Sequence, residues 1–274
     1  MKNLPHVPSR KIFANSKRIL ENPLHFHSEN FEKLGDTFRI SIPGEWKVIF
    51  SRDPVWFKQI HQKQHRAFEK SKLQTKDLAK YIGKGLLTAE GEHWRKHRKM
   101  IQPAFKASHV QRLLPIIQST IQQELENIEQ GIPQDVHALM GDLAFQVVAK
   151  SLFSKSDISD TMQRLKEITE INQNMLVREM RRPYLSWWFD LTGQTQKHLD
   201  FSKEAQDLLN LLIEKRSRDG GTGEDLLDVL LAATYEDGAP MPRRQLIDEV
   251  MILFTAGHET TANALAFTLY FIAQ

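Results

Sequence analysis

The chain has 274 residues, a mass of 31.8 kDa and 41% hydrophobic residues, enough to fold around a core, which excludes an intrinsically disordered protein. Its formal net charge of +3 is too small to favour nucleic acid as a partner, so a small molecule is expected instead. Cysteine is absent, which excludes a disulfide scaffold, a zinc–thiolate site and a thiol nucleophile built from this chain alone.

The first twenty residues mix prolines and basic residues with single apolar residues. This pattern lacks the uninterrupted apolar run of a signal peptide or a membrane anchor. Residues 246–274 have the length of a membrane span, but they carry Asp248, Glu249 and Glu259, and carboxylates are costly within a bilayer. We therefore expect a buried helix here and a cytoplasmic protein with no membrane anchor.

Alternating apolar and polar residues predict a small β-hairpin near the amino terminus. On either side of the turn residues 43–45, apolar positions recur at every second residue: Phe38, Ile40 and Ile42, then Trp46, Val48 and Phe50. From Asp53 onward apolar residues recur instead at three and four residues, as a helix face requires. The predicted fold class is therefore mainly α with a small amino-terminal β-hairpin, and no stretch is typical of an interdomain linker.

A basic segment over residues 91–99 is the first that could carry chemistry. Trp94 and Arg98 are four residues apart and so share one helical face. An indole N–H and a guanidinium on one face can bind a carboxylate or a phosphate group. The alternative is a solvated basic helix anchored by its tryptophan, which the pair considered alone favours. The basic run around Arg98 could also attract an acidic electron donor.

The second segment is a polar island, Ala256-Gly257-His258-Glu259-Thr260-Thr261, in a helix that is otherwise apolar on nearly every side. Gly257 leaves the backbone approachable, and the Thr260 hydroxyl can bond the carbonyl four residues back. A carboxylate next to a hydroxyl can deliver protons to a bound oxygen species. The alternative is a satisfied polar cluster with a packing glycine, and the segment alone does not decide between the two.

Histidine spacing does not predict a metal site. His258-Glu259 lacks the second histidine of a zinc-protease helix, because that position is Ala262. Two other pairs, at residues 61 and 65 and at residues 93 and 97, have ligand spacing but no evident third ligand. Chance spacing explains these pairs.

These two segments, in this order and joined by a mostly helical stretch, resemble the cytochrome P450 family of haem-thiolate monooxygenases. Residues 256–261 match the family's oxygen-binding motif, and Trp94 with Arg98 matches its haem-propionate pair. Pro103 and Phe105 match the Pro-x-Phe that follows that pair. The resemblance covers nearly the whole chain.

The resemblance implies haem as the cofactor and assigns roles to six residues. Glu259 and Thr260 would relay protons, Ala256 and Gly257 would line the haem, and Trp94 and Arg98 would hold its propionates. The implied reaction inserts one oxygen atom from O2 into an apolar organic substrate. A separate ferredoxin, flavodoxin or reductase would supply the electrons.

The chain departs from the family in having no cysteine to bind the haem iron. The family's Glu and Arg pair and its cysteine loop should follow the long helix, and the sequence ends at Gln274. We therefore expect residues 1–274 to be the amino-terminal part of a single cytochrome P450 domain, truncated, inactive alone and without the haem-cysteine part. Such a piece should bind haem poorly and expose apolar surface around Phe254, Phe267 and Leu269.

Two other hypotheses stay open at this point. The first is a noncatalytic helical binding module of this full length. The second is a haem carrier that uses a histidine as the axial ligand, because imidazole also binds haem iron.

Overall fold

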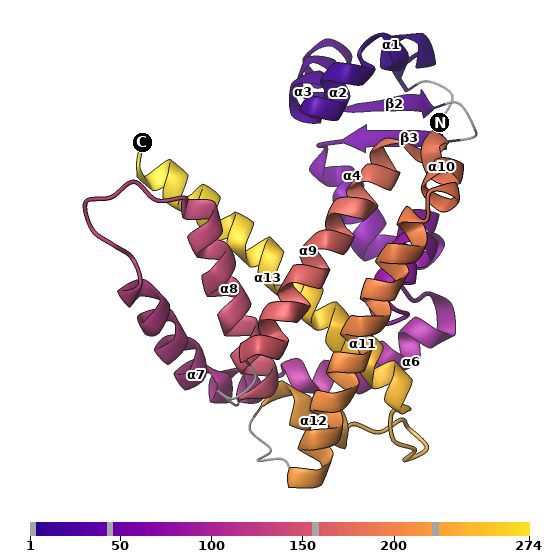
Figure 1. Cartoon of the computed structure of the whole chain (residues 1–274). Coiled ribbons are helices and arrows are strands. Elements are labelled where there is room, and N and C mark those ends of the chain that lie inside the picture. The colour runs from indigo at the N-terminus through magenta and orange to yellow at the C-terminus, as the bar shows by residue number, and fades with distance from the viewer. Residues whose placement is uncertain (1–3, 43–45, 155–158, 221–224) are drawn as a thin grey trace. The chain divides into compact units, whose positions relative to one another are not determined.

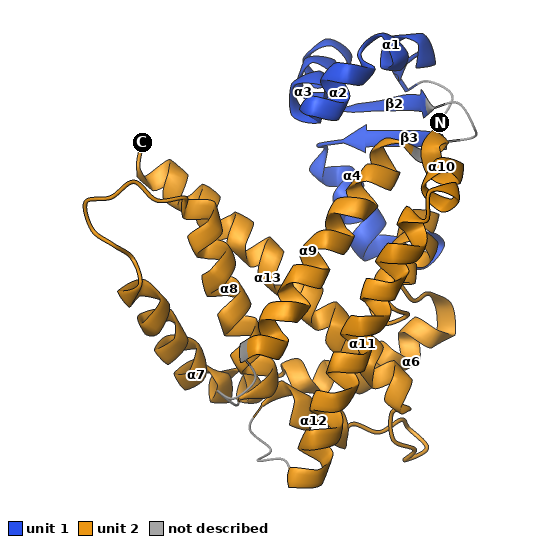
Figure 2. Cartoon of the chain, in the orientation of Figure 1, with its two compact units in different colours: residues 1–69 blue, residues 70–274 orange. Residues whose placement is uncertain are grey.

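The computed structural model describes residues 4–42, 46–154, 159–220 and 225–274. The chain divides into two compact units, residues 1–69 and residues 70–274 (Figure 2). Most described residues are helical, and a three-stranded sheet lies in the first unit (Figure 1). The structure thus confirms the predicted class, mainly α with an amino-terminal hairpin.

The first unit packs short helices on the sheet. Strand β2 pairs in antiparallel register with β3, with Phe38 opposite Phe50, and in parallel with β1. The core consists of Val7, Phe26, Phe38 and Ile40. The predicted turn at residues 43–45 lies outside the described residues. The elements are β1 (His6–Val7), α1 (Ser9–Ala14), α2 (Ser16–Glu21), α3 (Pro23–Leu34), β2 (Thr37–Ile42), β3 (Trp46–Ser51) and α4 (Pro54–Lys58).

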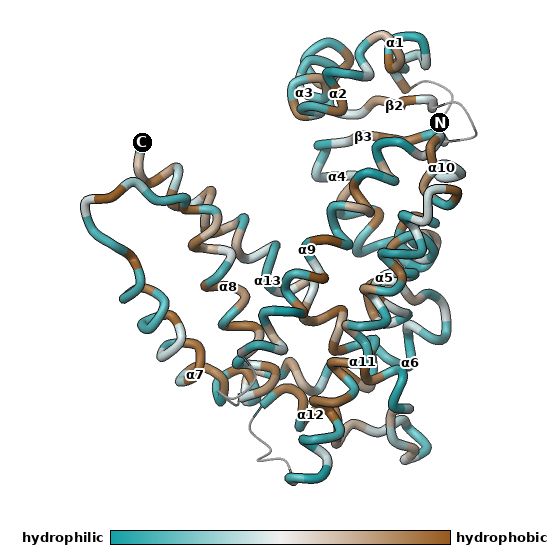
Figure 3. The backbone as a smooth tube through the Cα atoms, in the orientation of Figure 1, coloured by the Kyte–Doolittle hydropathy of each residue, from teal (hydrophilic) through white to brown (hydrophobic). Residues whose placement is uncertain are grey.

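The second unit is helical. Local sequence sets several of its helix ends: the Asp135 carboxylate caps the first turn of α8, and Gly83 ends α5 with a φ of 84° that favours glycine. Figure 3 shows hydrophobic and hydrophilic residues alternating along α9 and α11, as expected of helices with one buried face. The helices are α5 (Ala79–Ile82), α6 (Gly91–Ile101), α7 (Ala107–Glu126), α8 (Val136–Phe153), α9 (Ser159–Arg181), α10 (Ser186–Leu191), α11 (Gln194–Asp219), α12 (Leu226–Ala232) and α13 (Arg243–Ile272).

Helix α13 is central to the second unit, because it packs on α5, α8, α11 and α12. Its first two-thirds are largely buried, whereas the residues after Ala262 are exposed or half-buried. Phe267 and Leu269 are exposed, as predicted, but the prediction for Phe254 was wrong. Phe254 is fully buried, with its ring 5.3 Å from that of Phe145 on α8.

Among the described residues, one helix is long and apolar enough to cross a membrane, and it is α8 rather than the segment after residue 246. The structure packs α8 against α7 and α13. Seven of its residues are buried in the protein: Met140, Leu143, Ala144, Phe145, Ala149, Leu152 and Phe153. Length and composition alone are weak evidence for a membrane span, because a core helix has the same properties.

Replacing Phe254 should destabilise the fold far more than replacing Phe267 on the same helix. Phe254→Ala removes a fully buried ring and should lower the free energy of unfolding by about 3–5 kcal/mol. Phe267 is 63% exposed, so Phe267→Ala should change that free energy by no more than about 0.5 kcal/mol. Urea unfolding followed by far-UV circular dichroism compares the two, and equal losses would contradict the burial described.

Candidate functional site

Trp94 and Arg98 lie on the exposed side of α6. Trp94 is 37% exposed, and the Lys70 ammonium lies 5.8 Å from the centroid of its ring. Arg98 is exposed and forms no ion pair with any described residue. Arg95, on the same helix, is instead paired with Glu92 at 3.1 Å. The guanidinium of Arg98 is therefore available to an anion from outside the described part of the chain.

The segment predicted to face an oxygen species lies where α13 begins to emerge from the core. Ala256, Glu259 and Thr260 are exposed, whereas Thr255 and His258 in the same stretch are buried. The Thr260 hydroxyl donates to the Ala256 carbonyl at 2.8 Å, which confirms the predicted bond. α13 thus presents an acid and a hydroxyl in neighbouring positions on an otherwise largely buried stretch.

Contacts to other helices affect two residues of this segment. Glu259 accepts a hydrogen bond at 2.7 Å from the side-chain amide of Gln173 on α9, so one oxygen of the carboxylate is held in place. Gly257 faces Val148 on α8, and a Cβ at Gly257 would lie 3.0 Å from a methyl group of Val148. Gly257 therefore has a packing role, as in the alternative that the sequence left open.

Two of the six predicted residues, Trp94 and Arg98, lie on α6 and the other four lie on α13, and no hydrogen bond or ion pair joins the two groups directly in the described part of the chain. The side-chain contact between α6 and α13 that bears on them is His97 with Glu249. At 1.5 Å per residue, Ala256 lies about 10 Å and Thr260 about 16 Å farther along α13 than Glu249. The position of Trp94 and Arg98 relative to the four residues on α13 is therefore set by the length of α13 between them and by the contact of His97 with Glu249.

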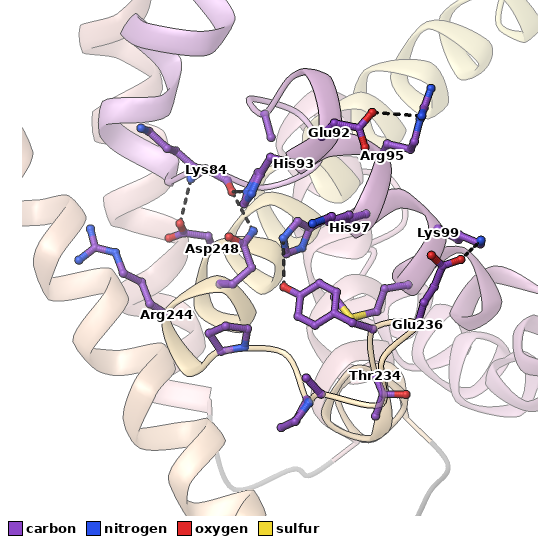
Figure 4. Close-up of a pocket in the computed structure, with 18 of the residues that line it drawn as sticks. Lys84, Glu92, His93, Arg95, His97, Lys99, Thr234, Glu236, Arg244 and Asp248 are labelled. Carbon is purple, nitrogen blue, oxygen red and sulfur yellow. Dashed lines mark hydrogen bonds and ion pairs between the residues drawn. The ribbon is translucent and has the colours of Figure 1, made fainter.

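A pocket of about 1620 Å³ lies between α6, residues 234–242 and the start of α13 (Figure 4). None of the six predicted residues lines it. Charges of both signs surround it, and the Lys99–Glu236 ion pair joins two of its sides. Charged residues that line it include Lys84, Glu92, Arg95, Glu236, Arg244 and Asp248. The lining thus combines charged groups of both signs with apolar surface.

Two buried acids on α13, Asp248 and Glu249, hold the loop that precedes α6. Asp248 Oδ2 accepts from the Lys84 amide and Glu249 Oε2 from the Leu86 amide, each at 2.9 Å. A Cβ at Gly85 would lie 2.7 Å from Glu249 Oε2. Sequence analysis missed this role and used the acids only as evidence against a membrane span. Adjacent acids in an apolar helix were the available signal, because buried carboxylates require partners.

His97 on α6 is 3% exposed and lies between two polar partners. Its Nδ1 is 3.4 Å from Glu249 Oε1, and its Nε2 is 3.2 Å from the Tyr235 hydroxyl. Burial, together with the neighbouring His93, lowers the pKa of His97 to about 4, whereas burial raises the pKa of Glu249. His97 is therefore neutral at pH 7.

Acid should destabilise the fold partly through His97. The pKa of His97 is about 4 in the folded protein, against an ordinary value of 6.5. The fold therefore keeps its full stability with respect to His97 above about pH 6.5, and loses stability as pH falls toward 4, because the unfolded chain then binds a proton that the folded protein does not. From pH 7 to pH 4 the free energy of unfolding should therefore fall less in His97→Gln than in the wild type. The difference between the two falls should reach about 3 kcal/mol. Glu249 acts in the opposite sense, because its raised pKa favours the protonated folded form.

Urea unfolding at pH 7, 6, 5 and 4 measures this difference. His137→Gln, at an exposed position on α8, should retain the pH dependence of the wild type. If His97→Gln also retains it, the burial of a neutral His97 does not contribute to stability.

Comparisons with known proteins agree with the fold and the motifs. The cytochrome P450 family model matches residues 5–274. Echinocystic acid 23-monooxygenase from Saponaria officinalis is 26% identical over 77% of this chain and 44% of its own length. Pentalenene oxygenase from Streptomyces avermitilis is 24% identical over 96% of this chain and 58% of its own length.

The structure of retinoic acid-bound cyanobacterial CYP120A1 has the same fold, with a TM-score of 0.72 and 23% identity over 89% of this chain and 54% of that one. The chain spans about half the length of the curated relatives it matches. Because the family model matches nearly every residue of the chain, this protein belongs to the cytochrome P450 family.

Proposed function

We propose that the chain is part of a haem-dependent monooxygenase that inserts one oxygen atom from O2 into an apolar organic molecule. Membership of the cytochrome P450 family supports an oxidoreductase of this kind. The observation that carries the proposal is the neighbouring carboxylate and hydroxyl, Glu259 and Thr260, both exposed on α13. Proton delivery to a bound oxygen species needs an acid and a hydroxyl in neighbouring positions, as this pair provides.

The residues of α6 fit the propionate groups of haem. Trp94 is partly exposed and Arg98 is exposed one turn later, without an ion-pair partner among the described residues. A guanidinium binds a carboxylate through two parallel hydrogen bonds, so Arg98 would hold one propionate and the indole N–H of Trp94 would add a donor. When bound, haem supplies the iron at which oxygen is activated.

On α13, Glu259 and Thr260 would move protons toward that oxygen. Gln173 holds one oxygen of the Glu259 carboxylate, which leaves the other free to take a proton from solvent. The Thr260 hydroxyl points its own proton at the Ala256 carbonyl, so Oγ1 can accept a hydrogen bond from the opposite side. The small side chain of Ala256 would leave room beside this pair, and Gly257 would add to the opening while it packs on α8.

The 274 residues include no cysteine, and the family's chemistry uses a thiolate to bind the iron. We propose that residues 1–274 are the amino-terminal part of one cytochrome P450 domain and that another segment of polypeptide supplies the thiolate. A ferredoxin, flavodoxin or reductase would donate electrons. Lys96 is exposed and forms no ion pair with a described residue, and a free basic group of this kind attracts an acidic partner.

Removing the Arg98 guanidinium should weaken haem binding. A charge-assisted hydrogen bond contributes about 1.5–3 kcal/mol, so Arg98→Leu should raise the Kd for haemin about 10- to 100-fold. Arg95→Leu is the matched control, since Arg95 lies on the same helix and is paired with Glu92. Absorbance titration of the chain with haemin measures both. Equal affinities of the two variants would contradict the propionate assignment and leave the noncatalytic module as the better hypothesis.

Replacing Thr260 should impair catalysis while replacing Thr261 should not. Both hydroxyls donate to the carbonyl four residues back at 2.8 Å, so Thr260→Ala and Thr261→Ala remove the same local bond. In a polypeptide that contains these residues and a cysteine ligand, Thr260→Ala should lower product formed per O2 consumed about 100-fold. Thr261→Ala should stay near the wild type. Similar losses in both variants would exclude a specific proton-transfer role for Thr260.

A further inference from the structure

We propose that Glu249 is a positioning residue for α6, the helix that carries Trp94 and Arg98. Its carboxylate holds the backbone just before α6 and faces a side chain within α6, and so fixes the direction in which the exposed side of that helix points. The consequence for haem rests on the proposed function, whereas the positioning of the loop and the helix does not.

The two oxygens of Glu249 reach two different parts of the chain. Oε2 accepts from the Leu86 amide at 2.9 Å, and Oε1 lies 3.4 Å from Nδ1 of His97. That nitrogen is buried and has no hydrogen-bond partner among the described residues. Gln245, one turn earlier on α13, donates to Oε1 at 3.0 Å and so orients the carboxylate. Glu249 thus bonds the loop to α13 and places its other oxygen against His97 of α6.

The loop between α5 and α6 depends on side chains from outside it. Besides the bonds to Asp248 and Glu249, the Lys84 carbonyl accepts from Gln245 at 2.8 Å. The Lys70 ammonium donates to the carbonyls of Leu86 and Ala89 at 2.6 and 2.8 Å. Since these groups satisfy loop backbone atoms that have no helical or strand partners, they fix the loop where it enters α6.

The contact at His97 also sets the rotation of α6 about its axis. Successive residues of an α-helix are about 100° apart around the axis. His97 directly precedes Arg98 and lies about 60° around the helix from Trp94. Because His97 packs against Glu249 and bonds the Tyr235 hydroxyl, and because the preceding loop is bonded to α13, Trp94 and Arg98 are directed to one fixed side.

Stability alone does not explain a carboxylate at this position. Glu249 is fully buried, and burial of a carboxylate is costly even when it has partners, so an apolar side chain would often be as stable. Gly85 leaves no room for a Cβ, which would lie 2.7 Å from Oε2. The loop is therefore fitted closely to an acid, as expected if the acid sets its position.

Hydrogen–deuterium exchange of the full 274-residue chain tests the loop directly. Glu249→Leu should speed exchange of the Leu86 amide at least about 10-fold while the buried Leu209 amide of α11 exchanges as in the wild type. Glu249→Gln retains an oxygen that can accept from Leu86 and should restore most of the protection. Glu236→Gln, an exposed acid paired with Lys99, is the control. Wild-type protection of Leu86 in Glu249→Leu would overturn the proposal.

A second variant covers the case in which Glu249→Leu does not fold. Gly85→Ala leaves the carboxylate intact and pushes the loop away from it, so it should also speed exchange at Leu86. Unchanged exchange at Leu86 in this variant would count against the proposal, because the loop would then be held by other contacts.

Haemin titration of single and double variants separates positioning from a general loss of stability. If Glu249 acts through Arg98, Glu249→Leu should raise the Kd about 10-fold in the wild type and change it less than 2-fold in Arg98→Leu. Equal effects in both backgrounds would overturn the positioning role. If Arg98→Leu itself leaves the Kd unchanged, the proposed function fails, and exchange at Leu86 still decides whether Glu249 holds the loop.

Discussion

Two adjacent carboxylates buried in an apolar helix are the constraint on which the candidate site depends. Asp248 and Glu249 are each at most 6% exposed, and acids at such positions are tolerated only when donors surround them. The donors are backbone amides of the loop before α6. The same bonds that satisfy α13 therefore also attach the loop and α6 to it, so the requirements of the core determine where the basic helix lies.

The features that were predicted correctly from the sequence are those that depend on residues close together in the sequence. The hairpin, the long helices and the bond from Thr260 to Ala256 all follow from periodicity or from contacts within one helical turn. Phe254 shows the limit of this reasoning. In a helix that is apolar on nearly every side, the pattern does not tell which side is covered, and Phe145 from α8 covers this one.

The features that sequence did not predict join distant parts of the chain. Leu86 and Glu249 are 163 residues apart, and no local pattern indicates that one binds the other. For Gly257 likewise, the sequence alone does not decide between an approachable backbone and a packing role. The packing role becomes evident only from the structure, in which Val148 lies opposite Gly257. The residue types were visible, and the adjacent acids were a signal, but their partners come from the packing of α13 on the loop and on α8.

Helix α13 connects the two halves of the candidate site. Near its start it binds the loop that leads to Trp94 and Arg98, and about 16 Å farther along it presents Thr260. Between these points most of its residues are buried and it packs on α8, so it does not bend or rotate locally without disturbing the core. A single rigid element thus relates the side of α6 that carries Trp94 and Arg98 to the acid and the hydroxyl. A movement of α13 would therefore displace both groups of residues together, whereas a change at Glu249 would affect only the loop and α6.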